Sequence, residues 1–189
     1  MNSHAIGLYG GSFDPIHNGH LLLARDAMER LNLERVIFLP AKISPHKLDR
    51  PPSPPEARLE LLEAATSQEP GFEVDPRELH REGPSFTIDT MRAYRAENPD
   101  TRLFYFIGDD NLSELHTWKD IEELKTLVQF VVLARTASPL PMDFPVISRR
   151  IEISSTEMRK RIARGASVRY MTPMNVCEKI QTLDLYRNE

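Results

Sequence analysis

The sequence contains a single cysteine, Cys177, so the chain cannot form an internal disulfide, and it lacks a cysteine and histidine set with zinc spacing. No apolar run approaches the roughly 20 residues that a membrane-spanning helix needs. The first residues enter a strand pattern almost at once, so we expect no signal peptide. These absences predict a cytoplasmic protein that does not associate with a membrane.

An excess of positive charge is also missing. The formal net charge is −4, which argues against a dedicated nucleic-acid binder. Basic residues nevertheless gather between residues 149 and 169, where only Glu152 and Glu157 oppose them. These basic residues are Arg149, Arg150, Arg159, Lys160, Arg161, Arg164 and Arg169. The cluster suggests a site for a small polyanion, and a solvated helix face is the alternative for any one of its members.

What is present fits one α/β domain over residues 1–189, and no internal repeat or low-complexity tail appears. Residues 5–10 form a predicted buried strand that ends in two glycines. Apolar residues then recur at helical spacing from 18 to about 31, and a short Val, Ile and Phe strand follows at 35–39. Strand, helix and strand in this order predict a right-handed βαβ unit.

A proline-rich stretch from 40 to 55 must be a loop, because proline lacks the backbone donor that helices and sheets need. We predict that this loop is a lid that closes over the site. Ser53 and Glu56 form a predicted capping box, with a proline at the first position of a helix that runs to about residue 67. Residues 71–75 follow as a predicted third strand.

The rest of the chain continues the alternation of strands and helices. A helix is predicted over 85–98, and continuous apolar runs at 102–107 and 128–134 are typical of parallel strands that are covered on both faces. A second capping box, Ser154 to Glu157, begins a helix that runs to about 163, and a last helix covers 173–183. The pattern predicts a Rossmann-like, doubly wound and mostly parallel sheet of five to six strands with helices on both faces, in which 154–189 is a helical C-terminal part.

In such a sheet, ligands bind beyond the carboxyl ends of the strands. The first strand ends at Gly10 and Gly11, and the helix that follows offers free N–H groups and a positive dipole. His17 and His20 are three residues apart at its start, so they share one face. Imidazole donors there could stabilise the charge on a phosphate, whereas the alternative is that they only cap the helix. A metal site is less favoured because no third ligand is in view.

Two segments resemble the signatures of one superfamily. Gly11-Ser-Phe-Asp-Pro-Ile-His17-Asn-Gly-His20 is similar to the HxGH motif of the nucleotidyltransferases, and Ile153-Ser-Ser-Thr-Glu-Met-Arg159 is similar to their ISSTxxR motif. The second segment would be a helix N-terminus with spare hydroxyls and an arginine one turn in, which suits the β- and γ-phosphates of ATP. Neither a Walker loop nor a G-x-G-x-x-G fingerprint is present.

Three further segments narrow the resemblance to bacterial nicotinate mononucleotide adenylyltransferases. They are Ser44 to Lys47, Arg81 to Thr90, and Trp118 after Gly108-Asp109-Asp110. Phosphopantetheine adenylyltransferases share the first motif, usually with threonine at position 17, and lack the segment around Thr87. The resemblance covers about residues 6–180, nearly the whole chain.

This resemblance implies transfer of AMP from ATP to nicotinate mononucleotide, which gives deamido-NAD and pyrophosphate in a step of NAD biosynthesis. The acceptor phosphate would attack the α-phosphate of ATP directly and in line, with Mg²⁺ bridging the phosphates of ATP. Three alternatives remain open: nicotinamide mononucleotide as the acceptor, phosphopantetheine as the acceptor, or a nucleotide sensor without catalysis. The chain could also form a homo-oligomer.

The resemblance also implies roles for individual residues. The catalytic residues would be His17, His20 and Arg159. Contacts to ATP would come from Gly11, Ser12, Phe13, His17, His20, Gly108, Asp110, Ser155, Thr156 and Arg159. Contacts to the mononucleotide would come from Gly10, Ser12, Lys47, Thr87 and Trp118, with the Trp118 indole stacked on the pyridine ring. Asp109 departs from the family, which usually has an uncharged residue there, so we expect its carboxylate to point away from the phosphates.

Overall fold

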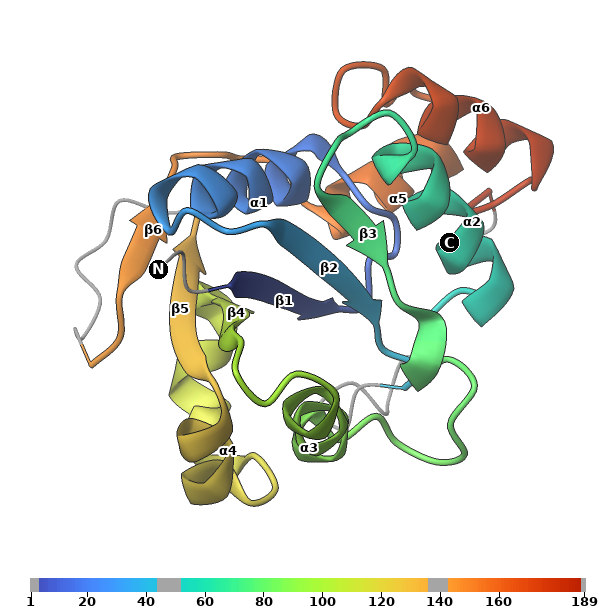
Figure 1. The fold of residues 1–189 in the computed structure, drawn as a ribbon. Helices are drawn as coiled ribbons and strands as arrows, with labels where there is room; N and C mark the ends of the chain where they lie inside the picture. The colour runs from blue at the N-terminus through green and yellow to red at the C-terminus, as the bar shows by residue number, and fades with distance from the viewer. Residues whose placement is uncertain (1–3, 44–51, 136–142, 188–189) are drawn as a thin grey trace.

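The structure is a computed structural model that describes residues 4–43, 52–135 and 143–187. A six-stranded sheet, with all its strands parallel, forms its centre in the order β3-β2-β1-β4-β5-β6 (Figure 1). The strands are β1 (Ala5–Gly11), β2 (Arg35–Pro40), β3 (Phe72–Val74), β4 (Arg102–Gly108), β5 (Gln129–Ala134) and β6 (Val146–Ser148). The predicted fold class is confirmed.

Helices cover both faces of this sheet, as the doubly wound pattern requires. The α-helices are α1 (Asn18–Arg30), α2 (Pro55–Thr66), α3 (Thr87–Glu97), α4 (Ile121–Leu127), α5 (Ser155–Ala163) and α6 (Met174–Thr182). One hydrophobic cluster packs α1, α2 and α6 against the sheet, and the other packs α3 and α4 on the opposite face (Figure 1). No helix within the described ranges is both long and apolar enough to cross a membrane.

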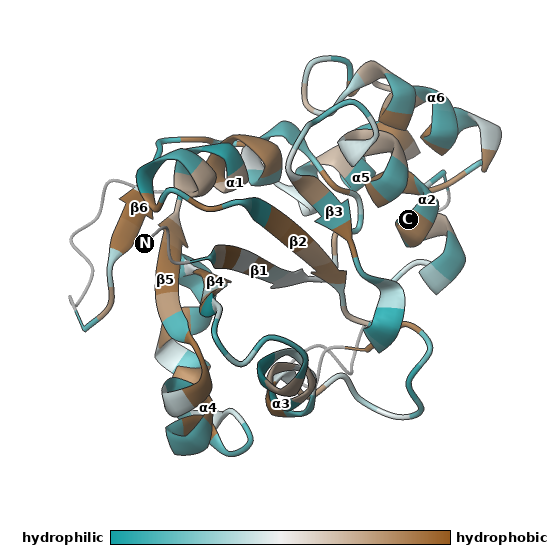
Figure 2. Ribbon diagram, viewed as in Figure 1, coloured by the Kyte–Doolittle hydropathy of each residue, from teal (hydrophilic) through white to brown (hydrophobic). Residues whose placement is uncertain are grey.

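The central strands are buried on both faces, which explains their unbroken apolar runs. Leu103 to Ile107 of β4 and Phe130 to Ala134 of β5 are buried throughout, and β2 and β5 are largely brown in the hydropathy view (Figure 2). A parallel strand between two helical layers has no solvent-facing side, so the alternation of polar and apolar residues disappears.

The chain reverses its direction of travel across the sheet at β1. It first adds β2 and β3 on one side of β1 and then returns to pair β4 with the other side. The carboxyl ends of β1 and β4 therefore lie at the switch point, where a doubly wound sheet leaves a crevice for ligands. Gly11 ends β1 and Gly108 ends β4.

Several local predictions need correction. Ser53 does not cap α2: the N-cap is Pro54 without a side-chain hydrogen bond, because Pro55 starts the helix one residue later than a Ser53 cap would require. The helix predicted from residue 85 begins at Thr87. The predicted cap of α5 is confirmed, since the Ser154 hydroxyl accepts a hydrogen bond from the Glu157 N–H over 3.1 Å.

Other elements lacked a clear sequence pattern. They are β6, α4 and two 3₁₀ segments, Pro76–Glu78 and Asp109–Thr117. The predicted lid over 40–55 falls largely on residues 44–51, outside the described residues.

Candidate active site

Two adjoining cavities open at the switch point. The polar cavity, of about 530 Å³, lies between the end of β1, α1 and α5, and the aromatic cavity, of about 210 Å³, lies toward α3 and the 3₁₀ segment Asp109–Thr117. Side chains that mark the polar cavity are His17, His20, Asp110, Arg135, Thr156 and Arg159. Those that mark the aromatic cavity are Glu78, Phe86, Thr87, Tyr105, Trp118 and Lys119. Both are lined by Gly10, Gly11, Ser12 and Asn111.

The shared wall is the backbone of Gly10–Ser12. A β-carbon on Gly10 would lie 2.0 Å from the hydroxyl oxygen of Tyr105, so a larger residue would collide with that ring. The carbonyl of Ser12 accepts a hydrogen bond from Arg58 over 2.8 Å, and Arg58 is fully buried. The wall between the cavities is therefore held from behind by a buried guanidinium.

Phe13 follows this wall in an unusual backbone conformation. Its φ of 46° lies in the left-handed region, which a bulky residue rarely adopts. Its ring packs edge-on against Tyr9 and His20, with ring centroids 5.4 and 5.2 Å away. The packing keeps the turn after β1 in this conformation and places Phe13 in the wall of the polar cavity.

The two histidines cap α1 through one nitrogen each. His17 is the N-cap and His20 is the third residue of the helix: the backbone N–H of His20 donates to His17 Nδ1 over 3.4 Å, and that of His17 donates to His20 Nδ1 over 3.3 Å. Their rings stack with centroids 3.7 Å apart. Because each Nδ1 accepts, we assign the ring proton to Nε2. The capping interpretation is thus correct, and it leaves the opposite nitrogen as a donor.

His17 is neutral in this setting. Burial, and then the positive charge of Arg135, lower the pKa of His17 to about 3. The side chain is fully buried against the protein wall of the polar cavity, and its Nε2 has no hydrogen-bond partner among the described residues. An uncharged N–H donor without a protein partner is suited to an anionic oxygen.

The second motif faces the first across the polar cavity. At the start of α5 the Ser155 hydroxyl donates to the carbonyl of Pro15 over 2.9 Å, while the Ser154 hydroxyl caps the helix. The expectation of spare hydroxyls is therefore wrong for Ser155, whose hydroxyl hydrogen is used in this bond, whereas the Ser154 hydroxyl accepts a bond and keeps its own hydrogen. The first turn of α5 still offers backbone N–H groups and a positive dipole, and Thr156 lines the cavity.

Arg159 connects the two motifs directly. Its Nη1 donates to the carbonyl of Asp14 over 2.7 Å, and its Nη2 lies 3.5 Å from Thr156 Oγ1. Only 9% of the residue is exposed, and it lines the polar cavity. The arginine therefore has a structural bond to the loop after β1 as well as a position at the cavity.

The basic cluster of the sequence does not form one site. Among the described residues, Arg159 is the only member of the basic cluster that lines the polar cavity. Arg149 forms a bidentate pair with Asp26 at 2.7 Å, Arg161 donates to the carbonyl of Ser167, and Arg164 donates to that of Lys160. The segment folds partly as a helix, which distributes its residues around an axis, so the predicted polyanion site is wrong for most of the cluster.

Arg135 supplies the polar cavity with positive charge that most of the basic cluster does not bring to it. It directly follows β5, lines the polar cavity, and places Nη2 3.8 Å from an oxygen of Asp110. Its backbone N–H donates to the carboxylate of Asp109 over 3.3 Å, so Asp109 faces the end of β5 and not the cavity. Sequence reasoning missed Arg135, although its place after the carboxyl end of a predicted strand was a usable signal.

Gly108 and Asp110 also line the polar cavity, at the end of β4. A β-carbon on Gly108 would lie 2.3 Å from Asp110 Oδ1, so the glycine allows the carboxylate to fold back over the strand end. Lys47, the remaining predicted residue, lies outside the described residues. In the described part of the chain, no three His, Cys, Asp or Glu side chains come together as a metal site.

The aromatic cavity brings Thr87 and Trp118 together. Thr87 is the first residue of α3, and its hydroxyl lies 3.4 Å from that of Tyr105. The Trp118 ring is half-buried and makes edge contacts with Tyr105 and Phe130, at centroid distances of 6.1 and 6.3 Å. Both predicted residues line this cavity, although 31 positions separate them in the chain.

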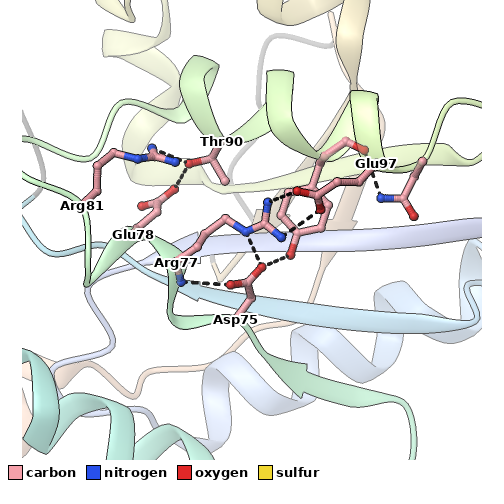
Figure 3. A network of polar contacts seen from close by, with 8 residues as sticks. Asp75, Arg77, Glu78, Arg81, Thr90 and Glu97 are labelled. Atoms are coloured by element: carbon pink, nitrogen blue, oxygen red, sulfur yellow. Dashed lines mark hydrogen bonds and ion pairs between the residues drawn. The ribbon is translucent and has the colours of Figure 1, made fainter.

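Glu78 is a further residue of this cavity that sequence reasoning missed, because nothing around it resembles a motif. Its carboxylate accepts a hydrogen bond from the hydroxyl of Thr90 over 2.7 Å, and Arg81 donates to Thr90 over 2.9 Å (Figure 3). The hydroxyl of Ser85 donates a second hydrogen bond to the Glu78 carboxylate. Burial raises the pKa of Glu78. Ser85 in turn accepts from the backbone N–H of Lys42, so the chain of bonds ties the start of α3 to the end of β2.

Comparison with known proteins agrees with this arrangement. Residues 8–161 match the model of the cytidylyltransferase-like family. The chain is 44% identical over 187 residues to a protein of Thermus thermophilus, with 96% of this chain and 99% of that protein covered. It is 41% identical over 190 residues to a protein of Opitutus terrae, with coverages of 96% and 97%. Both relatives are described as probable nicotinate-nucleotide adenylyltransferases.

Solved structures share the fold. Nicotinic acid mononucleotide adenylyltransferase of Plasmodium falciparum complexed with NaAD superposes with a TM-score of 0.79 at 18% identity, and the same enzyme complexed with APC with 0.78 at 17%. In each comparison 98% of both chains is covered. On the strength of the family model and of the relatives above 40% identity, this chain belongs to the cytidylyltransferase-like family and, within it, to the nicotinate-nucleotide adenylyltransferases.

Proposed function

We propose that this protein transfers AMP from ATP to nicotinate mononucleotide, forming nicotinate adenine dinucleotide and pyrophosphate. The observation that carries the proposal is the pair of cavities that meet at Gly10–Ser12, one lined by cationic and imidazole groups and the other by aromatic rings. A polyphosphate suits the first cavity and a pyridine ring suits the second. The α-phosphate and the acceptor phosphate would then meet at the shared wall.

The reaction at this wall is a direct displacement. An oxygen of the acceptor phosphate forms a bond to the α-phosphorus of ATP while the bond from that phosphorus to the pyrophosphate oxygen breaks. The acceptor phosphate is already ionised near neutral pH, so the step needs neither a protein nucleophile nor a general base. What it needs is alignment of the two phosphates and stabilisation of the charge that moves onto pyrophosphate.

The polar cavity supplies groups of the right kind for that charge. His17 and His20 offer Nε2–H donors from the start of α1, and the guanidinium of Arg159 lies across the cavity beside the first turn of α5. His17 acts as a neutral donor, because its lowered pKa keeps it uncharged at physiological pH. We assign Gly108, Asp110 and Arg135 to the rest of ATP at the ends of β4 and β5.

The aromatic cavity would hold the mononucleotide. The indole of Trp118 would stack on the pyridine ring, and Thr87 and the first turn of α3 would face the ring substituent. A helix N-terminus favours an anionic carboxylate over a neutral carboxamide, which supports nicotinate as the acceptor. The amide mononucleotide is the second candidate acceptor.

Mg²⁺ stays a prediction: ATP would enter as its magnesium complex, so chelation of the metal should stop turnover. The cytoplasmic location, the single domain and self-association also stay predictions.

The test is release of pyrophosphate from purified protein with ATP and Mg²⁺, run in parallel with nicotinate mononucleotide, nicotinamide mononucleotide and phosphopantetheine. We expect turnover with the first acceptor and much slower turnover with the other two. Faster turnover with the amide would reassign the acceptor. Binding of ATP without pyrophosphate release from any acceptor would favour the sensor alternative.

A further inference from the structure

Asp14, in the loop between Phe13 and His17, is held at each of its oxygen atoms. Its carboxylate accepts hydrogen bonds from the Tyr186 hydroxyl over 2.8 Å and from the Ser53 N–H over 3.1 Å, and its carbonyl accepts from Arg159 over 2.7 Å. Only 8% of Asp14 is exposed. A buried carboxylate that accepts from two donors is a strong and directional anchor for the loop that carries it.

Tyr186 reaches this loop from the far end of the chain. It follows α6, its ring is buried in the same hydrophobic cluster as residues of α2 and α6, and only 7% of it is exposed. Its φ of 66° is in the left-handed region, which costs free energy in a residue with a large side chain. The surrounding contacts therefore hold Tyr186 in a conformation that points its hydroxyl at Asp14.

A second C-terminal residue holds the same loop. The buried hydroxyl of Thr172 donates to the carbonyl of Ile16 over 2.9 Å, directly before His17. The backbone N–H of Asn18 donates to the carbonyl of Met171 over 2.8 Å. The segment that follows α5 thus fixes the loop on both sides of His17.

We propose that Tyr186 and Thr172 are positioning residues for the transfer reaction, which set the loop 14–17 and thereby the Nε2 donors of His17 and His20. The inference rests on the proposed function, since it concerns the rate of that reaction. The physical reason is that catalysis by fixed donors depends on their placement, and an error of about 1 Å can cost around a hundredfold in rate. Neither residue lines the cavities, so neither acts by touching a substrate.

A purely structural role would lower stability alone, and the chain contains a matched control for it. Tyr94 is also a buried tyrosine whose hydroxyl donates to an aspartate, Asp75, over 2.5 Å, and neither of these residues lines the polar or the aromatic cavity. Tyr186→Phe and Tyr94→Phe each remove one such bond and leave the ring in place. For Thr172→Val the control is Thr66→Val, because Thr66 donates to the carbonyl of Leu62 in another buried bond.

The experiment measures kcat, both KM values and the melting temperature for the wild type and these four variants. Binding of nicotinate mononucleotide is followed separately by the fluorescence of Trp118, the only tryptophan. We expect Tyr186→Phe and Thr172→Val to lower kcat by about tenfold or more with unchanged mononucleotide binding. The two control variants should match the wild type in kcat, although their melting temperatures should fall by about as much as those of Tyr186→Phe and Thr172→Val.

Equal kcat values for Tyr186→Phe, Tyr94→Phe and the wild type would overturn the role of Tyr186. If Tyr186→Phe does not fold, the result for Thr172→Val decides, and wild-type kcat in that variant would overturn the proposal for the C-terminal segment. A wild-type protein without turnover would instead remove the proposed function itself, so the two failures can be distinguished.

Discussion

The polar and the aromatic cavity share the backbone of Gly10–Ser12 but are assembled in different ways. The polar cavity draws on the starts of α1 and α5 and the ends of β1, β4 and β5, and its groups are backbone donors, imidazoles and arginines at fixed points. The aromatic cavity draws on ring side chains of three separate segments, at Phe86, Tyr105 and Trp118, and the ring of Trp118 packs edge-on against that of Tyr105. In the proposed assignment of the substrates, anion recognition would depend on secondary-structure geometry, whereas ring recognition would depend on tertiary packing.

The largest expected effect comes from the polar cavity. We predict that His20→Asn lowers kcat by about 10²- to 10³-fold, because one donor to the transition state is lost, while ATP binding changes little. Asparagine retains an acceptor for the His17 N–H, so the cap of α1 survives. Pyrophosphate release and ATP titration measure the two effects. Normal turnover of this variant would refute the transition-state role of His20.

The next effect concerns stability against pH. The folded-state pKa of His17 is about 3, below the unfolded value of 6.5, so the unfolded chain binds a proton first as the pH falls. The contribution of neutral His17 to the free energy of unfolding is fully present above about pH 6.5 and is lost as the pH falls toward 3. At pH 5 the loss should be about 2 kcal/mol.

Urea denaturation between pH 7 and pH 5 measures this loss as a difference between the wild type and His17→Asn. The control is His116→Gln, which replaces an exposed histidine. This variant should keep the wild-type dependence of the free energy of unfolding on pH. If His17→Asn keeps the same pH dependence as the wild type, His17 is not a buried neutral donor.

A smaller effect is expected from Arg135, the charged residue of the polar cavity that sequence reasoning missed. We predict that Arg135→Gln raises the KM for ATP by about tenfold, because one ion pair or charged hydrogen bond to the nucleotide is lost. The KM for the mononucleotide should not change. A change confined to the mononucleotide would reverse our assignment of the two cavities.

The smallest effect is expected in the aromatic cavity. Ring stacking contributes about 0.5–1.5 kcal/mol beyond burial. Trp118→Ala should therefore weaken mononucleotide binding by about threefold to tenfold from the loss of stacking, and further from the loss of buried area. Trp118→Phe should restore part of the affinity, and the KM for ATP should stay the same. Steady-state kinetics with each substrate varied in turn gives both values. An unchanged mononucleotide KM in Trp118→Ala would place the acceptor elsewhere.

The contrast between the cavities also explains what could be predicted from the sequence. Gly10 to His20 and Ile153 to Arg159 are contiguous, because a strand end and a helix start supply most of a phosphate site within one short segment. Sequence reasoning therefore predicted that both segments meet at the strand ends, and residues of both line the polar cavity. It read the Ser53 cap one residue too early, since Pro54 and Pro55 both fit a helix start.

The aromatic cavity could be predicted from the sequence only through the family resemblance around Thr87 and Trp118. Glu78, Tyr105 and Asn111 join it through the packing of distant segments, and no local spacing records that packing. The 3₁₀ segment Asp109–Thr117 contains only two apolar residues, Leu112 and Leu115, and β6 is too short for any period to be read.

The central claim is that both substrates are bound together and that the acceptor phosphate attacks across the Gly10–Ser12 wall without an AMP–protein intermediate. The most direct test uses ATP that carries a sulfur of defined chirality at the α-phosphorus, with the configuration of the dinucleotide product read by phosphorus NMR. A single in-line displacement predicts inversion of configuration at that phosphorus. Retention would require two displacements through a covalent intermediate on the protein, and it would contradict this account.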